Sequence, residues 1–309
     1  MQVRYLKNKD INRTRWDLAV DQSPSGLPYA YSWYLETLVG NQWDGLVFGD
    51  YDLVMPLPWN RKLFGIPQLF QPPFCQQLGV FGVEEKQALP TFIEAIPQRF
   101  QYVLLSLATV NSNWEEWSID GTFRTKENLI LSLDYSYEEL SSNFSKSLRK
   151  RIRKAKGQLS LESSEDVNGL IQFYQKELAG KVGLTSDRCQ RLALLFSTLL
   201  DKNMAEIYVV KTPNQQICCQ GLFLKTKHRI INLFGASNDL GRKLFAMHFL
   251  LAKVLERHAN QAINFDFEGS EIPGVANFFK SFGPQSAPFL EYKRDHLPTL
   301  LSRIKERRF

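Results

Sequence analysis

The sequence predicts an α/β protein made of two units of comparable length, and three observations lead to this prediction. The chain has 309 residues, 44% of them hydrophobic, which is enough for two domains that each bury a core. Segments with helical spacing of apolar residues alternate with short runs of strand-forming residues. A long helical pattern lies in the middle, so we expect one unit over residues 1–135 and a second over 136–309.

The first unit is expected to combine a short sheet with helices. Gly49-Asp50 separates two alternating runs and predicts a β-hairpin. The stretch 65–82 contains Pro72-Pro73 and predicts a loop that feeds a strand. The other expected elements are strands at 3–6, 102–107 and 128–133 and helices at 10–21, 31–39 and 84–98.

The second unit is expected to begin with the clearest helix of the chain, over 136–156. Ser136 and Glu139 fit a capping box, and Gly157 supplies a C-terminal stop. Within this segment apolar residues recur at helical spacing, namely Phe144, Leu148, Ile152 and Ala155. The elements expected after it are helices at 165–179, 187–202 and 242–258, a three-stranded meander at 205–211, 217–225 and 229–234, and a strand at 263–267.

The composition indicates which partners, metal sites and cellular location to expect. The net charge of +6 and the pI near 9.0 are compatible with anionic partners such as a nucleotide, a phosphorylated cofactor or tRNA. The four cysteines and four histidines are not spaced like a disulfide framework or a metal site, so we expect no metal. The N-terminus lacks the apolar core of a signal peptide, and no apolar run is as long as a membrane span. We therefore expect a cytoplasmic protein.

Two short motifs near the C-terminus make the prediction more specific. A strand pattern ends in Phe265-Asp266-Phe267-Glu268-Gly269, and Phe279-Lys280-Ser281-Phe282-Gly283 follows. Together with the preceding order of helix, meander and long helix, these residues resemble the C-terminal region of FemABX-like proteins. The resemblance covers 231–292 most clearly, extends to 139–156, and reaches 1–130 only in general layout.

The resemblance implies a fold and an activity. FemABX-like proteins have two GNAT-like units and transfer an acyl or aminoacyl group to an amine. The expected donor is acyl-CoA or aminoacyl-tRNA, bound as a co-substrate with no tightly held cofactor, and the expected acceptor is a small-molecule or peptide amine. The choice of donor stays open, because the long helical hairpin of some tRNA-using members is absent and 235–242 is only an approximate pyrophosphate loop.

Three residues are the predicted catalytic groups. An amine must lose a proton before it attacks a carbonyl, so Asp266 or Glu268 is expected to orient or deprotonate the acceptor. The resemblance gives Lys280 the role of a cation near the developing oxyanion or a substrate phosphate. The alternative for the two acids is a solvated strand face, or side chains that hold the turn at Gly269-Ser270 in place.

A further set of residues is expected to bind substrate. Arg149 and Arg153 belong to the basic segment SKSLRKRIRKAKG and would bind an anionic portion of a substrate, unless this segment is simply a solvated helix face. Gln76 and Gln77 could read amides of the acceptor, whereas the neighbouring Cys75 is expected to be buried and structural. The other predicted binding residues are Ser237, Asn238, Ser270 and Tyr292.

Two other functions fit the same residues. A binding protein that kept the fold but lost the chemistry would explain the lack of a clear pyrophosphate loop. A general RNA-binding protein would explain the basic segment, and its affinity would fall steeply with salt.

Overall fold

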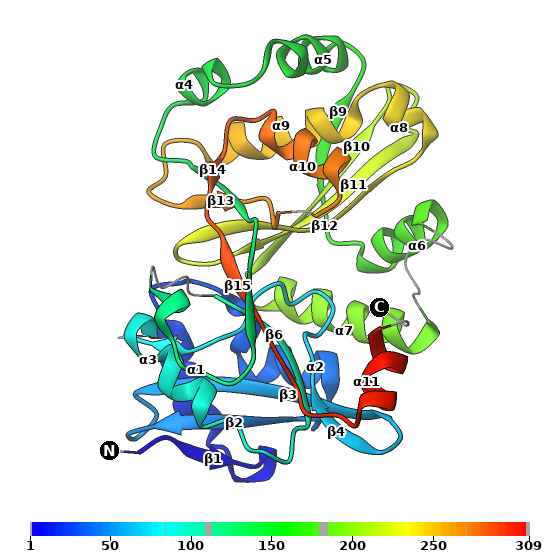
Figure 1. Cartoon of the computed structure of the whole chain (residues 1–309). Helices are drawn as coiled ribbons and strands as arrows, with labels where there is room; N and C mark the ends of the chain where they lie inside the picture. The colour runs from blue at the N-terminus through cyan, green and yellow to red at the C-terminus, as the bar shows by residue number, and fades with distance from the viewer. Residues whose placement is uncertain (1, 84, 109–112, 179–184, 270, 307–309) are drawn as a thin grey trace. The chain divides into compact units, whose positions relative to one another are not determined.

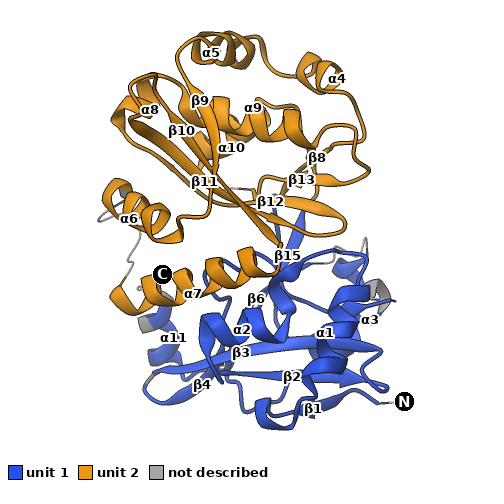
Figure 2. Ribbon diagram, turned by 180° about the vertical axis from the view of Figure 1, so that it is seen from behind, with its two compact units in different colours: residues 1–126, 288–309 blue, residues 127–287 orange. Residues whose placement is uncertain are grey.

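The computed structural model describes residues 2–83, 85–108, 113–178, 185–269 and 271–306 (Figure 1). They form two compact units, one of residues 1–126 with 288–309 and one of residues 127–287 (Figure 2). This grouping differs from the predicted division at 135/136. The strand β15 (Phe289–Asp295) belongs to the first unit because it is hydrogen-bonded between β6 (Tyr102–Leu107) and β7 (Thr122–Lys126).

The first unit contains a mixed sheet with the strand order β1-β2-β3-β4-β6-β15-β7, and β5 pairs with β3. The remaining bounds are Arg4–Leu6 for β1, Trp43–Phe48 for β2, Leu53–Leu63 for β3, Ile66–Leu69 for β4 and Phe81–Gly82 for β5. The hairpin predicted at Gly49 is confirmed as the β2–β3 turn. The strand β4 was missed, because it lies in a stretch rich in proline and glutamine that reads as a loop. The helices are α1 (Arg13–Gln22), α2 (Ser32–Val39), α3 (Glu85–Glu94) and α11 (Thr299–Glu306).

The second unit contains a seven-stranded sheet in the order β14-β8-β13-β12-β11-β10-β9. The predicted meander is confirmed as three antiparallel strands, β10 (Ala205–Lys211), β11 (Ile217–Lys225) and β12 (Arg229–Ser237). The other strands are β8 (Leu129–Ser132), β9 (Ser160–Ser164), β13 (Asn264–Asp266) and β14 (Gln285–Ser286).

Helices cover both faces of this second sheet (Figure 1). On one face Phe234 of β12 stacks on Tyr174 of α6 (Val167–Leu178) and packs against Phe196 of α7 (Ser186–Asp201). On the other face α5 (Lys146–Lys156) and α9 (Ala246–His258) contribute Leu148 and Phe249 to the main core. The remaining helices of the unit are α4 (Tyr137–Ser142), α8 (Asp239–Lys243) and α10 (Pro273–Lys280).

The helix predicted over 136–156 is two helices, α4 and α5. The capping box of Ser136 and Glu139 is confirmed at the start of α4. The chain breaks at Phe144, whose ring packs edge-on against Phe282 with centroids 5.3 Å apart. Ser145 then donates its backbone N–H to the carbonyl of Ser281 at 2.8 Å, and its hydroxyl caps α5. The contacts of Phe144 and Ser145 with residues 281–282 therefore interrupt the single helix that the apolar spacing predicted.

The helix predicted over 242–258 is also interrupted. It is α8 followed by α9, and Phe245 between them has a left-handed backbone with φ of 59°. Gly241 in α8 lies against β11 so closely that a Cβ there would be 2.0 Å from the carbonyl oxygen of Cys218. A glycine is therefore required for α8 to pack backbone to backbone on the sheet.

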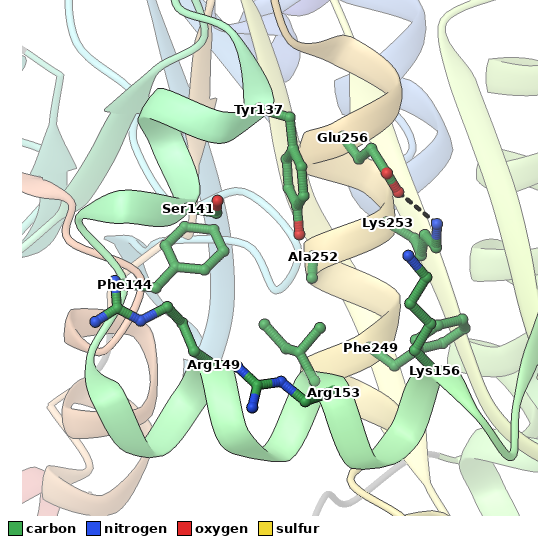
Figure 3. A pocket seen from close by; sticks show the side chains of 11 residues that line it. Tyr137, Ser141, Phe144, Arg149, Arg153, Lys156, Phe249, Ala252, Lys253 and Glu256 are labelled. Carbon is green, nitrogen blue, oxygen red and sulfur yellow. Dashed lines mark hydrogen bonds and ion pairs between the residues drawn. The ribbon is translucent and has the colours of Figure 1, made fainter.

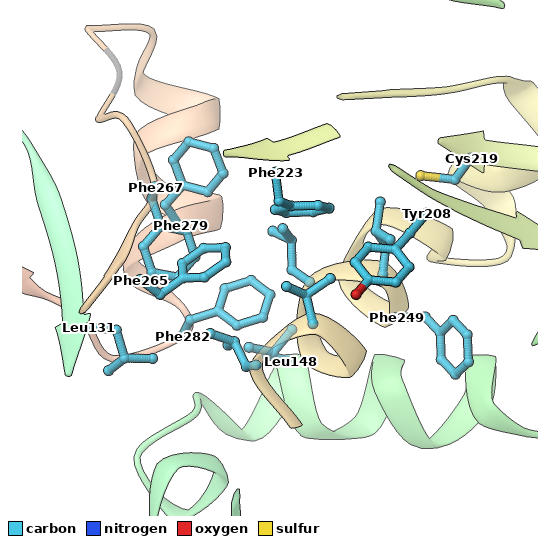
Figure 4. Packing of buried hydrophobic residues seen from close by; sticks show 14 of the residues in the cluster. Leu131, Leu148, Tyr208, Cys219, Phe223, Phe249, Phe265, Phe267, Phe279 and Phe282 are labelled. Carbon is cyan, nitrogen blue, oxygen red and sulfur yellow. The ribbon is translucent and has the colours of Figure 1, made fainter. Parts of the chain in front are cut away.

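The core of the second unit is rich in phenylalanine (Figure 4). The rings of Phe223, Phe265, Phe267, Phe279 and Phe282 pack in a chain with centroid separations of 4.8 to 6.1 Å. Each fully buried ring contributes about 1.5–3 kcal/mol to the free energy of folding. This packing places Phe279 and Phe282 in the core and joins α10 to the segment that follows β13.

Candidate functional site

The second sheet opens between β12 and β13. The two strands are parallel and pair over only three positions, from Arg229–Asn264 to Ile231–Asp266. The strand β13 ends there, whereas β12 continues to Ser237. Among the described strands none pairs with this side of β12 beyond Ile231. A strand edge of this kind leaves backbone N–H and C=O groups available to a ligand.

A β-bulge lies in the same half of β12. The partner of Leu222 is Phe234 and the partner of Phe223 is Asn232, so Leu233 is an extra residue in the ladder with β11. Bulges bend a strand and increase its local twist. The bulge therefore helps β12 to turn away from the line of β13.

Asp266 sits at the point where the strands separate and is fully buried. One carboxylate oxygen accepts a hydrogen bond from the Arg229 guanidinium at 2.7 Å, and the other accepts one from the backbone N–H of Glu268 at 2.8 Å. Neither face of β13 is solvated, since Phe265 on the opposite face is buried as well. Asp266 thus joins β12 to β13 and holds the turn that follows.

Glu268 occupies that turn, and its side chain is partly exposed. Its backbone is left-handed with φ of 53°, an uncommon conformation for a residue other than glycine. The next residue, Gly269, has φ of 22°, and a Cβ there would lie 2.2 Å from the carbonyl oxygen of Glu127. The turn is therefore tightly specified, and Glu268 follows the end of β13 by two residues. Ser270 lies outside the described residues.

Lys280 is the last residue of α10 and is exposed. Its helix is fixed to the strand end because Phe267 packs on Phe279 at 5.3 Å and on Phe282 at 5.6 Å. The two motifs that flank the turn are thus joined by aromatic packing, which positions the acids and the lysine on neighbouring segments of one rigid core.

In the loop predicted to hold pyrophosphate, two side chains are engaged in hydrogen bonds and ion pairs. Asn238 caps α8 by accepting a hydrogen bond from the N–H of Gly241 at 2.8 Å, and it donates to the carbonyl of Ile217 at 3.0 Å. Arg242 forms ion pairs with Asp239 at 2.6 Å and with Glu177 at 3.7 Å. Ser237 is the last residue of β12, immediately before this loop. The side chains of Asn238 and Arg242 are therefore engaged within the loop.

The predicted arginines Arg149 and Arg153 line one cavity of about 230 Å³ between α4, α5 and α9 (Figure 3). Its apolar lining includes the rings of Phe144 and Phe249, and the hydroxyl of Tyr137 points into it. Burial and the nearby Glu256 raise the pKa of Tyr137 to about 12, so this hydroxyl is a proton donor at neutral pH.

The other predicted binding residues belong to the first unit. Gln77 is buried and donates to the side-chain oxygen of Gln76 at 2.6 Å. Tyr292 is fully buried, and its hydroxyl donates to the carbonyl of Asp120 at 2.8 Å. Cys75 is buried, as expected. The structure therefore places Tyr292 in the core of the first unit and brings the two glutamines together.

Sequence reasoning missed Arg229, which holds Asp266. The available signal was an arginine at the start of an otherwise apolar strand, which requires a buried counter-charge. It also missed Tyr137, which lines the cavity together with α5 because the chain breaks between α4 and α5. Among the described residues no cluster of His, Cys, Asp and Glu is arranged to hold a metal ion. None of the described helices combines the length and hydrophobicity needed to cross a membrane.

No protein-family model matches the chain, and no curated protein matches it by sequence. Solved structures do resemble it over nearly its whole length. FemX is 16% identical, with 98% of this chain and 99% of that chain covered and a TM-score of 0.64. L-PGS from Bacillus licheniformis is 13% identical, with 95% and 94% covered and a TM-score of 0.56.

A tandem GNAT protein from the clavulanic acid biosynthesis pathway is 12% identical, with 96% of this chain and 100% of that chain covered and a TM-score of 0.51. At these identities the likeness shows the fold. The predicted fold class, an α/β chain of two tandem GNAT-like units with mixed sheets, is confirmed, as is the resemblance of its fold to FemX.

Proposed function

We propose that this chain, which has the tandem GNAT fold of FemX, is an N-acyltransferase that moves an acyl or aminoacyl group from an activated donor to an amine. The observation that carries the proposal is the opening between β12 and β13, where β12 offers an unpaired edge from Asn232 to Ser237. An extended donor can lie along this edge and hydrogen-bond to its backbone groups.

The proposed reaction is a direct displacement. The neutral amine of the acceptor attacks the carbonyl carbon of the donor, a C–N bond forms, and the C–O or C–S bond to the carrier breaks. The proton that the amine loses passes to a carboxylate, which transfers it to the leaving oxygen or sulfur, so that the carrier is released as the alcohol or thiol and the carboxylate is regenerated. No covalent intermediate with the enzyme is needed.

The geometry favours Glu268 over Asp266 as the carboxylate that receives the proton. Both oxygens of Asp266 are engaged, one by Arg229 and one by the backbone N–H of Glu268. Glu268 is partly exposed, and its strained backbone is held by this same contact. We assign Asp266 the role of positioning residue and Lys280 that of the cation that stabilises the developing negative charge.

The state of the 237–243 loop favours aminoacyl-tRNA over acyl-CoA as the donor. A CoA pyrophosphate needs free amide donors and a cation at this loop, but the N–H of Gly241 donates to Asn238 and the guanidinium of Arg242 pairs with Asp239. An aminoacyl ester has no pyrophosphate to accommodate. The seven exposed cations of α5 would add sequence-independent attraction for RNA phosphates.

The test is a transfer assay with aminoacyl-tRNA and acetyl-CoA offered separately, together with peptide and small-molecule amines, and product detection by mass spectrometry. We expect product from aminoacyl-tRNA. Lys280→Ala should lower kcat by about 10²–10³-fold, since one donor to an oxyanion contributes on this scale. Lys202→Ala is the matched control, because Lys202 is also an exposed lysine at a helix C-terminus.

Three outcomes would each contradict a part of the proposal. Binding of a donor without product would identify a binding protein that retains only the fold. Equal turnover by wild type and Lys280→Ala would remove Lys280 from the mechanism. Product from acetyl-CoA alone would retain acyl transfer but reverse the donor assignment.

A further inference from the structure

The cavity between α4, α5 and α9 has the features of a separate ligand site. Its lining comes from α4, the α4–α5 break, α5 and α9, whereas the opening described above is formed by β12 and β13. Its volume of about 230 Å³ exceeds the roughly 150 Å³ of an apolar protein cavity that holds benzene. The cavity can therefore admit an aromatic ring or a short acyl chain.

The charges at the cavity are unbalanced. Lys253 forms an ion pair with Glu256, which is the acidic residue of the lining. Three further cations of α5 remain, Arg149, Arg153 and Lys156 (Figure 3). Arg149 donates one hydrogen bond to the carbonyl of Ser142 at 2.9 Å.

The cavity thus joins an apolar floor to a rim with an excess of about three positive charges. Phe144, Phe249 and Ala252 are each almost fully buried and form the floor. A carboxylate carries only one negative charge, whereas a phosphate monoester carries about −1.5 to −2 at pH 7 and accepts hydrogen bonds from several donors at once. The Tyr137 hydroxyl adds a neutral donor between floor and rim.

We propose that this cavity binds a phosphate monoester with an apolar substituent, the phosphate at Arg153 and Lys156 and the substituent against Phe144 and Phe249. The inference does not depend on the proposed acyl transfer. A neighbouring hollow of about 470 Å³ shares Lys156, Phe249, Lys253 and Glu256 with the cavity and leaves room for a longer ligand past Leu159. The phosphate can therefore come from a soluble metabolite or from a membrane lipid.

Calorimetric titration of the full chain with phenyl phosphate tests the site. Inorganic phosphate lacks the ring and benzyl alcohol lacks the phosphate. We expect each to bind at least about tenfold more weakly than phenyl phosphate, because one loses the burial of the ring and the other loses the charge-assisted hydrogen bonds. Arg153→Gln should weaken phenyl phosphate binding about tenfold or more. Lys150→Gln removes an equal charge from the same helix but outside the lining, and it should change the affinity by less than about twofold.

Vesicles distinguish the two sources of the phosphate. A lipid is the source if the protein is retained on vesicles that contain phosphatidic acid but not on vesicles of phosphatidylcholine alone. In that case Arg153→Gln should abolish the retention and Lys150→Gln should not. Binding of phenyl phosphate without vesicle retention would assign a soluble ligand. Equal affinity for inorganic and phenyl phosphate, or equal losses in the two variants, would overturn the proposal, because it would reveal only a diffuse basic surface.

Discussion

At the scale of single residues, Glu206 illustrates how the second unit holds a buried histidine. Glu206 accepts hydrogen bonds from His258 at 2.8 Å and from the Tyr208 hydroxyl at 2.7 Å. His258 is almost fully buried at the end of α9. The hydrogen bond from His258 is the largest cause that lowers the pKa of Glu206 from 4.5 to about 2. The carboxylate is therefore bound more strongly in the folded state than in the unfolded chain.

This pKa shift predicts an acid-dependent loss of stability. Because the folded pKa is lowered, the contribution of Glu206 is complete above about pH 4.5 and is lost as the pH falls toward 2. Glu206→Gln should remove about 1–3 kcal/mol of the free energy of unfolding at pH 6 and much less near pH 2. Urea denaturation at several pH values measures this difference. If Glu206→Gln lowers the free energy of unfolding by the same amount at pH 6 and at pH 2, the ionised Glu206 carboxylate does not stabilise the fold in this way.

Asp266 shows what residue patterns can and cannot predict. The aromatic-Asp-aromatic-x-Gly pattern correctly located the end of a central strand beside a turn. It could not show that the carboxylate points into the protein, because its partner Arg229 lies 37 residues earlier in the chain. The alternative noted for Asp266, that it holds the turn in place, agrees with its observed hydrogen bond to Glu268.

At the scale of elements, helical spacing predicted the existence of most helices better than their ends. The periodic residues of 136–156 all face the core, yet the helix breaks at Phe144 because its ring and the Ser145 N–H contact the end of α10. That end is more than 130 residues away in sequence, so no local pattern reports it. The break in turn forms part of the cavity, which explains why its lining was not predicted.

Phe282, which packs between the start of α5 and the end of β13, gives a prediction at the scale of elements. Phe282 is fully buried and contacts Phe144 and Phe267, whereas Phe278 is only partly buried. Phe282→Ala should lower the free energy of unfolding by about 3–5 kcal/mol, because it leaves a cavity in the core. Phe278→Ala is the matched control and should cost clearly less. Chemical denaturation of both variants checks this, and equal losses would show that Phe282 does not join these two elements.

At the scale of the whole molecule, the sequence predicted two α/β units but not their exact membership. Strands 102–107 and 205–225 were recognised from local patterns. The return of β15 to pair with β6 and β7 joins residues more than 160 positions apart, and such pairing leaves no signal in one sequence. The same holds for β8, which pairs with β13 and so belongs to the second unit.

The central claim is that the opening between β12 and β13 holds the reactive end of the acyl donor. A crystal structure with a stable aminoacyl-tRNA analogue, in which an amide replaces the 3′ ester, tests it most directly. We expect the aminoacyl group to lie along β12 between Asn232 and Ser237, with its carbonyl near Lys280. An analogue bound elsewhere on the chain, with this edge of β12 empty, would contradict it.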